Sequence, residues 1–214
     1  MSRLTRTIAG ALVTALAAAT LATSARAQVG RTAGMLDPNL ATEAELTAVP
    51  NVTPALAKTI IGKRPFLRPS DFTSVLAGLS KEQQAQTYAK LWLHLDLNTA
   101  SDEEILSVPG IGNRMLREFK EYRPYKALAQ FKREMGKYVK PEEVDRMAGY
   151  VFVPMDLNTA SDEDLLTIPG LGNRMLKEFK EYRPYKAVEQ FRREMGKYVK
   201  PGEVSRLERY IVIQ

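Results

Sequence analysis

The residues best suited to chemistry in this chain lie in a glycine turn that occurs twice, 60 residues apart. The turn reads PGIG at residues 109–112 and PGLG at residues 169–172. The proline ends one helix, the first glycine can adopt positive φ, and the second glycine opens the next helix with no side chain in the way. Backbone N–H groups at a helix start have no intrahelical partner, and the helix dipole adds partial positive charge there. Such a turn is suited to hold a phosphate oxygen.

Basic side chains follow both turns, which we name hairpin two (109–112) and hairpin three (169–172). Arg114 and Arg174 lie two residues after the second glycine of each turn, and Arg117 and Lys177 lie about one helical turn further on. We expect these cations to reach an anion held by the turn. The alternative is that the glycines serve turn geometry and helix packing alone.

Catalytic and metal-binding patterns are not found in the sequence. The chain has a single histidine, His94, and no cysteine, so no Ser-His-Asp, Cys-His or metal-spaced set can be assembled from it. His94 lies beside Trp92 in the apolar stretch LWLHL, which favours a packed or surface role. The acidic run from Ser101 to Glu104 is typical of a helix cap. We therefore expect no enzymatic activity, no cofactor and no small-molecule substrate.

The two hairpins belong to a tandem repeat. Residues 96–154 and 156–214 match at an offset of 60, with 41 of 59 positions identical. A more divergent copy precedes them at an offset of 59, where Pro50 matches Pro109 and Arg64 matches Arg123. A fixed period of this length marks a duplicated structural unit.

The repeat predicts three domains after a leader. We expect a signal peptide at 1–27, a flexible linker at 28–35, and units one, two and three at 36–95, 96–155 and 156–214. Each unit should hold about four short helices, because Ser101 to Glu104 forms a capping box, Ser161 and Thr42 begin similar ones, and Met115, Leu116, Phe119 and Tyr122 share one helical face. The predicted fold class is therefore all-α, and strand patterns are confined to the tails YVFV and YIVI.

Export is predicted from the first 27 residues. Arg3 and Arg6 precede an apolar run of about 15 residues, and Ala25-Arg26-Ala27 forms a small-x-small cleavage pattern before Gln28. An uncleaved anchor is the alternative. Loss of three arginines lowers the basic residues from 31 to 28 against 25 acidic ones, so the net charge falls from +6 to +3. We expect a periplasmic or cell-surface location and, from the modest basic charge, an anionic partner.

The stretch DLNTASDEEILSVPGIGNRM (96–115) resembles the helix-hairpin-helix signature of ComEA-type competence proteins, which are exported DNA receptors. The resemblance implies tandem helix-hairpin-helix (SAM/RuvA-C-like small helical) domains that bind the backbone of double-stranded DNA without reading sequence. It also implies that the hairpin amides contact phosphate. The expected DNA-binding residues are Gly110, Ile111, Gly112, Asn113, Arg114, Arg117, Gly170, Leu171, Gly172, Asn173, Arg174 and Lys177.

The chain departs from this family pattern in three places. Leu116 and Leu176 stand where the family usually has a small alanine, and the second hairpin of each unit is replaced by the longer basic connector EMGKYVKP. In unit one, Asn51 and Thr53 replace the hairpin glycines and Ala55 replaces the arginine. We expect unit one not to bind phosphate.

Other basic and aromatic residues have two readings. Lys120, Arg123, Lys126, Lys132, Arg133, Lys137 and Lys140 form either a binding stripe or a surface paired with the neighbouring glutamates. Tyr122 falls on the apolar helix face, which favours core packing over base stacking. The partner expected first is double-stranded DNA, with contacts to membrane uptake machinery or another exported protein. The alternative is a structural or adaptor protein that uses its helical units to bind protein.

Overall fold

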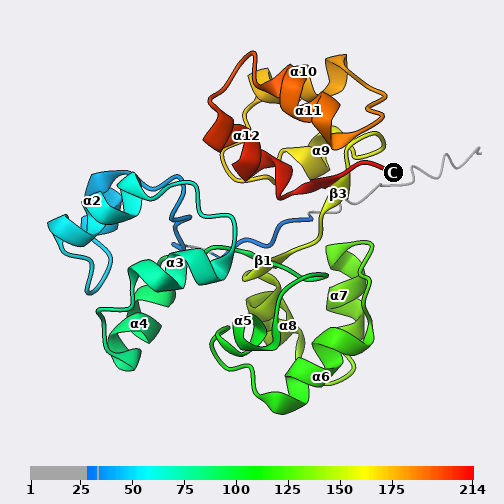
Figure 1. Cartoon of the computed structure of the whole chain (residues 1–214). Helices are drawn as coiled ribbons and strands as arrows, with labels where there is room; N and C mark the ends of the chain where they lie inside the picture. The colour runs from blue at the N-terminus through cyan, green and yellow to red at the C-terminus, as the bar shows by residue number, and fades with distance from the viewer. Residues whose placement is uncertain (1–27, 33) are drawn as a thin grey trace, which may run out of the picture.

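The protein is mainly helical, as a computed structural model of residues 28–32 and 34–214 shows. The expected signal peptide (1–27) lies outside the described residues. Twelve helices occur in the described part, and they lie in three groups that follow chain order (Figure 1). None of these helices is long and apolar enough to cross a bilayer. The expectation of an all-α class is confirmed at this level.

The helices are short in all three groups. The first group holds α1 (Glu43–Thr47), α2 (Pro54–Gly62), α3 (Pro69–Val75) and α4 (Lys81–Tyr88). The second holds α5 (Asp102–Leu106), α6 (Asn113–Glu121), α7 (Leu128–Met135) and α8 (Pro141–Ala148). The third holds α9 (Asp162–Leu165), α10 (Asn173–Glu181), α11 (Val188–Met195) and α12 (Pro201–Glu208).

The predicted capping residues begin the first helix of each group. The Ser101 hydroxyl accepts a bond from the Glu104 amide, and the Glu104 carboxylate accepts one from the Ser101 amide, so the capping box is complete. Thr42 and Glu45 form the same reciprocal pair before α1. At α9 only the first of these two bonds forms: the Ser161 hydroxyl accepts a hydrogen bond from the amide of residue 164.

Short strands join the two ends of each helical group. Strand β1 (Leu95–Asp96) pairs in parallel with β2 (Val151–Phe152), and β3 (Met155–Asp156) pairs in parallel with β4 (Ile211–Val212). A single parallel bridge between Leu36 and Leu91 does the same for the first group. The β-branched tails therefore form the strands, and each pairing closes a segment of about 60 residues.

The buried apolar side chains gather into three cores that follow the same division. Phe72, Phe119 and Phe179 lie in successive cores and are at most 2% exposed. Trp92 joins the first core to the second, because its ring packs edge-on against Tyr88 and Tyr150 at centroid distances of 5.4 and 5.1 Å. Burial of such aromatic surface is the main favourable term in a chain without disulfides.

A repeated asparagine and arginine pair fixes the loop that follows the second helix of each unit. The Asn98 side chain donates from Nδ2 to the Tyr125 carbonyl (3.0 Å), and its Oδ1 accepts a bond from the Tyr125 backbone N–H (2.7 Å). Arg123 donates to the Leu97 and Ala100 carbonyls at 2.6 and 2.8 Å. Asn39 with Phe66 and Asn158 with Tyr185 repeat the double bond. The recurring D-x-N and R-P elements are therefore structural.

The lead-in, residues 28–35, differs from the flexible linker that we expected. Val29 is 1% exposed and bridges Phe152 in antiparallel fashion, and Gly30 donates to the Val151 carbonyl at 3.0 Å. The Gln28 side chain accepts from the Leu128 amide at 2.9 Å. The start of the lead-in thus pairs with β2 through an isolated antiparallel bridge. Sequence alone could not show this, because the partner strand lies more than 100 residues away in the chain.

Candidate nucleic-acid interface

Hairpins two and three adopt the conformation that their glycines permit. Gly110 and Gly170 have φ of 80° and 75°, a region that other residues rarely adopt. Gly112 and Gly172 are the N-caps of α6 and α10, and neither helix start has a side-chain cap. All four glycines are exposed. The two helix starts are therefore open to solvent with their first amides uncapped.

The amides of the two hairpins do not all remain free. The Ile111 amide donates to the Val108 carbonyl, and the Leu171 amide donates to the Ile168 carbonyl, both at 3.1 Å. Both side chains are buried in their cores. Within the described residues no acceptor bonds the amides of Gly110, Gly112, Gly170 and Gly172. The amides open to a ligand are thus those of the glycines and the first helical residues, Asn113 and Asn173.

The four predicted cations stay exposed and unpaired. Arg114, Arg117, Arg174 and Lys177 are exposed, and the ion pairs found among residues 28–32 and 34–214 involve none of them. Each pair of cations lies within the first half of α6 or α10. Their charge adds to the partial positive charge of the helix start.

Several other basic residues are already paired with carboxylates, although Lys126 and Lys140 are exposed and form no ion pair among the described residues. Lys120 bonds Asp102 at 2.6 Å, Lys180 bonds Asp162 at 2.7 Å, and Lys132 bonds Asp145 at 2.8 Å. These pairs favour the paired-surface reading over the binding stripe. Arg123, as described above, is used by the fold.

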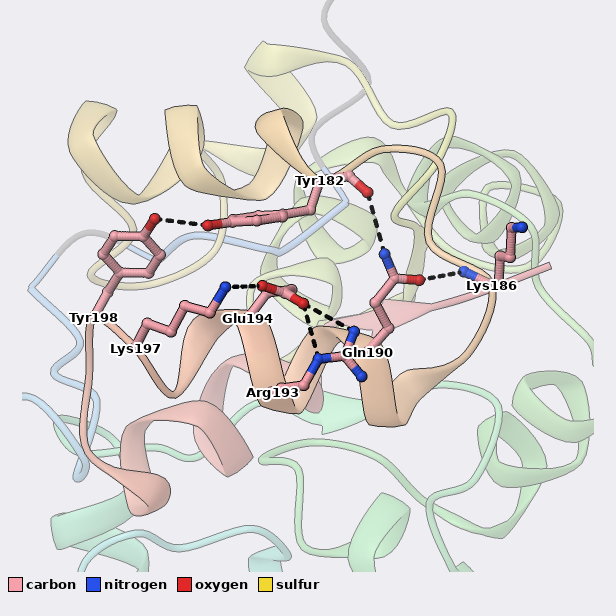
Figure 2. A network of polar contacts seen from close by, with 7 residues as sticks. All are labelled: Tyr182, Lys186, Gln190, Arg193, Glu194, Lys197 and Tyr198. Carbon is pink, nitrogen blue, oxygen red and sulfur yellow. Dashed lines mark hydrogen bonds and ion pairs between the residues drawn. The ribbon is translucent and has the colours of Figure 1, made fainter.

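A second network neutralises two further cations in each repeated unit. Figure 2 shows Arg193 and Lys197 converging on Glu194, which is only 7% exposed. The hydrogen bond from Lys197 lowers the pKa of Glu194 below its usual value. Burial acts in the opposite direction, and the hydrogen bond from Arg193 adds a smaller lowering effect. Arg133, Glu134 and Lys137 repeat the arrangement in unit two, so these lysines and arginines are not free for an anion.

The tyrosines that follow α6 and α10 are engaged internally. The Tyr122 and Tyr138 hydroxyls are 2.8 Å apart, as are those of Tyr182 and Tyr198 (Figure 2). Tyr125 is 1% exposed and packs edge-on against a core phenylalanine. Core packing, which the position of Tyr122 favoured, is confirmed: Tyr122 is partly buried against the second core, and Tyr125 is buried within it. A stacking role for bases has no support here.

An arginine–glutamate pair flanks the first glycine of each hairpin, and sequence reasoning missed it. Arg206 donates to the Pro169 carbonyl at 2.7 Å and pairs with Glu203 at 2.6 Å. Arg146 pairs with Glu143 at 2.5 Å, and a Cβ on Gly110 would lie 2.9 Å from its Nη2 atom. The only signal was that both arginines occupy the same repeat position. The positive φ favours glycine at the first position of each hairpin, and a Cβ there would also crowd the tip of this arginine.

Hairpin one (50–53) keeps the turn but fills its helix start. Asn51 has φ of 66°, the same left-handed region as Gly110. The Thr53 hydroxyl accepts from the Leu56 amide at 3.2 Å, so α2 carries its own cap. Thr87 donates to the Pro50 carbonyl at 3.0 Å, in the repeat position of Arg146. That unit one binds no phosphate stays a prediction, and this self-capping supports it.

His94 is a packed residue, in line with one of the two roles expected. It is 9% exposed, and its Nε2 lies 2.9 Å from the Gly30 carbonyl. Burial lowers its pKa, and this effect outweighs the nearby charge of Asp37. No cluster of three or more potential metal ligands occurs within the described part of the chain.

Comparison with known proteins gave no relatives: no family model matches the chain, and no curated protein or solved structure is significantly similar to it. The functional interpretation therefore depends on the residues and geometry of this chain.

Proposed function

We propose that this chain is an exported, double-stranded DNA-binding protein that binds without sequence preference and acts in DNA uptake, as in competence. Its helical groups would be tandem helix-hairpin-helix domains of the ComEA type, after removal of a signal peptide ending at Ala27. The site of action would be the periplasm or the cell surface. DNA would reach the membrane uptake machinery or another exported protein from there.

The proposed mechanism uses backbone amides and the cations behind them. A phosphate oxygen accepts bonds from the free amides at the start of α6 or α10, and Arg114 or Arg174 adds a charge-assisted contact. These groups contact only the sugar-phosphate backbone, so base sequence is not read. Two hairpins engage about two to four phosphates, which predicts a slope of log affinity against log salt of about −2 to −4.

The observation that carries this proposal is the placement of exposed cations, unpaired among the described residues, directly behind uncapped helix starts. Arg114 and Arg174 are exposed and unpaired among the described residues, whereas Lys120, Lys132 and Lys180 are held by carboxylates. A purely structural glycine turn does not require free cations behind it. Duplication of the hairpin would then raise avidity, because the second contact forms within the same complex.

Binding to a random DNA duplex, measured by fluorescence anisotropy between 50 and 200 mM salt, tests the proposal. Replacing Arg114 and Arg174 together by glutamine should weaken binding and make the salt slope shallower by about 1–2. The matched control replaces Arg133 and Arg193 by glutamine, since both are exposed but bonded to a buried glutamate. Equal losses in both double variants would remove the hairpins from the mechanism. No binding by the parent at 50 mM salt would refute the function.

The second candidate function is an exported adaptor that binds protein through its helical units. One observation favours it: the first glycine of hairpin three already contacts a side chain of unit one, because a Cβ on Gly170 would lie 3.1 Å from Leu40 carbons. A glycine turn of this kind can therefore pack against protein. Absence of DNA binding by the parent would favour this alternative.

A further inference from the structure

We infer that hairpins two and three have different roles despite their nearly identical sequences: hairpin two holds the DNA phosphate, and hairpin three is the surface on which unit one and its lead-in dock. The first half rests on the proposed function and narrows it, because DNA contact by hairpin two alone would replace the two-hairpin contact and its avidity. The second half concerns contacts within the chain and is tested without DNA.

Hairpin three is surrounded by residues from the start of the chain. Its cleft of about 370 Å³ is lined by residues 29–32, Met35, Asp37 and His94 on one side and by residues 166–171 on the other. Arg31 donates to the Leu166 carbonyl at 3.3 Å, just before the hairpin. Leu40 carbons lie 3.1 Å from the Cβ position of Gly170. One face of hairpin three is therefore occupied by protein.

Hairpin two also faces unit one across a cleft, but its first glycine is approached by its own unit. The three atoms nearest to the Cβ position of Gly110 belong to Arg146 and Glu143 of its own unit. Its cleft of about 340 Å³ lies between residues 106–111, Tyr150 and one face of α4. None of the described lead-in residues lines this cleft. A DNA backbone can approach hairpin two without displacing the lead-in.

The charges in the two clefts also differ. Lys81 is the one charged residue lining the cleft of hairpin two, and it is exposed and forms no ion pair among the described residues. In the cleft of hairpin three, Asp37 offsets Arg31, and the Asp37 Oδ2 atom is buried without a hydrogen-bond partner. A phosphate is attracted by the cation of the first cleft, whereas the second cleft carries both a cation and a carboxylate and attracts an anion less.

The arginines beside the first glycines, Arg206 and Arg146, also differ in their burial. The Arg206 side chain is 2% exposed, whereas that of Arg146, in the equivalent position of unit two, is 31% exposed. Arg206 is fixed by its bond to the Pro169 carbonyl, whereas the hydrogen bonds of Arg146 within the described residues go to Glu143. Arg206 is thus a positioning residue for hairpin three, whereas Arg146 pairs with Glu143 and is more exposed beside hairpin two.

The near-identical copies supply a matched pair of variants for DNA binding by the full chain. Arg114→Gln should weaken binding to a random duplex at 50 mM salt about fivefold and make the salt slope shallower by about 1. Arg174→Gln should change affinity less than twofold. Equal losses, or a larger loss for Arg174→Gln, would overturn the assignment. If the parent does not bind DNA, the proposed function and the role of hairpin two fail together, and only the docking half remains.

Trypsin cleavage after Arg31 tests the docking half without DNA. Gly170→Ala places a Cβ against Leu40 and should loosen the lead-in, so cleavage after Arg31 becomes about fivefold faster. Gly110→Ala imposes similar backbone strain at the other hairpin, and its Cβ meets no residue of unit one. It should leave this cleavage rate within twofold of the parent. Equal rates in the two variants would show that hairpin three does not hold the lead-in.

Discussion

The two glycines of hairpin two should respond very differently to alanine. Gly110 has φ of 80°, and a Cβ there would lie 2.9 Å from Nη2 of Arg146. Gly112 has φ of −114° and ψ of 178°, which any residue adopts, and a Cβ there meets nothing within 4 Å. Alanine at Gly110 therefore tests what the hairpin contributes to stability, and alanine at Gly112 tests its proposed contact with DNA.

The magnitudes follow from backbone strain and unfolded-state entropy. Alanine in the left-handed region costs about 1–2 kcal/mol, and reduced freedom of the unfolded chain returns about 0.4–1 kcal/mol. Displacement of the Arg146 guanidinium from its bonds to Glu143 adds to the cost. We expect Gly110→Ala to lower the free energy of unfolding by about 1–2 kcal/mol. At Gly112 the poorer alanine N-cap and the entropy gain nearly cancel, leaving a change of about 0.5 kcal/mol or less.

Urea unfolding followed by Trp92 fluorescence measures both changes. Trp92 is the only tryptophan, and it packs at the boundary of the first and second cores, so it reports on unit two. The midpoint for Gly110→Ala should fall by about 1 M urea, given a slope of roughly 1–2 kcal/mol/M. The reasoning is refuted if Gly112→Ala shifts the midpoint as much as Gly110→Ala does. Since Gly112→Ala preserves the fold, it is the cleaner variant for testing the hairpin amides.

Two further predictions concern the fold. Asn98→Ala removes both hydrogen bonds to the Tyr125 backbone and should lower the free energy of unfolding by about 2–4 kcal/mol. Asn98→Asp keeps the acceptor and should lower it less. Equal losses of unfolding free energy in urea would contradict this account. Burial lowers the folded pKa of His94 below its ordinary 6.5, so its contribution is complete above about pH 6.5 and is lost as the pH falls toward the folded pKa. Between pH 7 and pH 5 the parent should therefore lose more unfolding free energy than His94→Gln, and parallel pH profiles would exclude His94 as the cause.

The candidate site was predictable from sequence only in part. The glycine turns, the helix starts behind them and the positions of Arg114 and Arg174 follow from local patterns, and the structure places them together at exposed helix starts. The side chains that support the turns were not predictable. Arg206 reaches the Pro169 carbonyl and Thr87 reaches the Pro50 carbonyl, each across 37 residues. No spacing rule within one helix brings such residues together.

Local interactions let the sequence alone determine where helices begin and end. The box of Ser101 and Glu104 and the glycine N-cap at residue 112 act within one turn of helix, so their effect does not depend on the rest of the chain. The apolar face of α6 likewise follows from a spacing of three and four residues. The sequence also established the near identity of units two and three.

The tertiary structure decided which charges are free and which hairpin is open. Lys132 and Arg114 look alike in sequence, yet Lys132 is paired with Asp145 of another helix and Arg114 is not paired among the described residues. Hairpins two and three differ because the lead-in and Leu40 lie beside hairpin three and, among the described residues, not beside hairpin two. Ion pairing and packing depend on distances in space between segments far apart in the chain, and a repeat therefore fixes local conformation without fixing its surroundings.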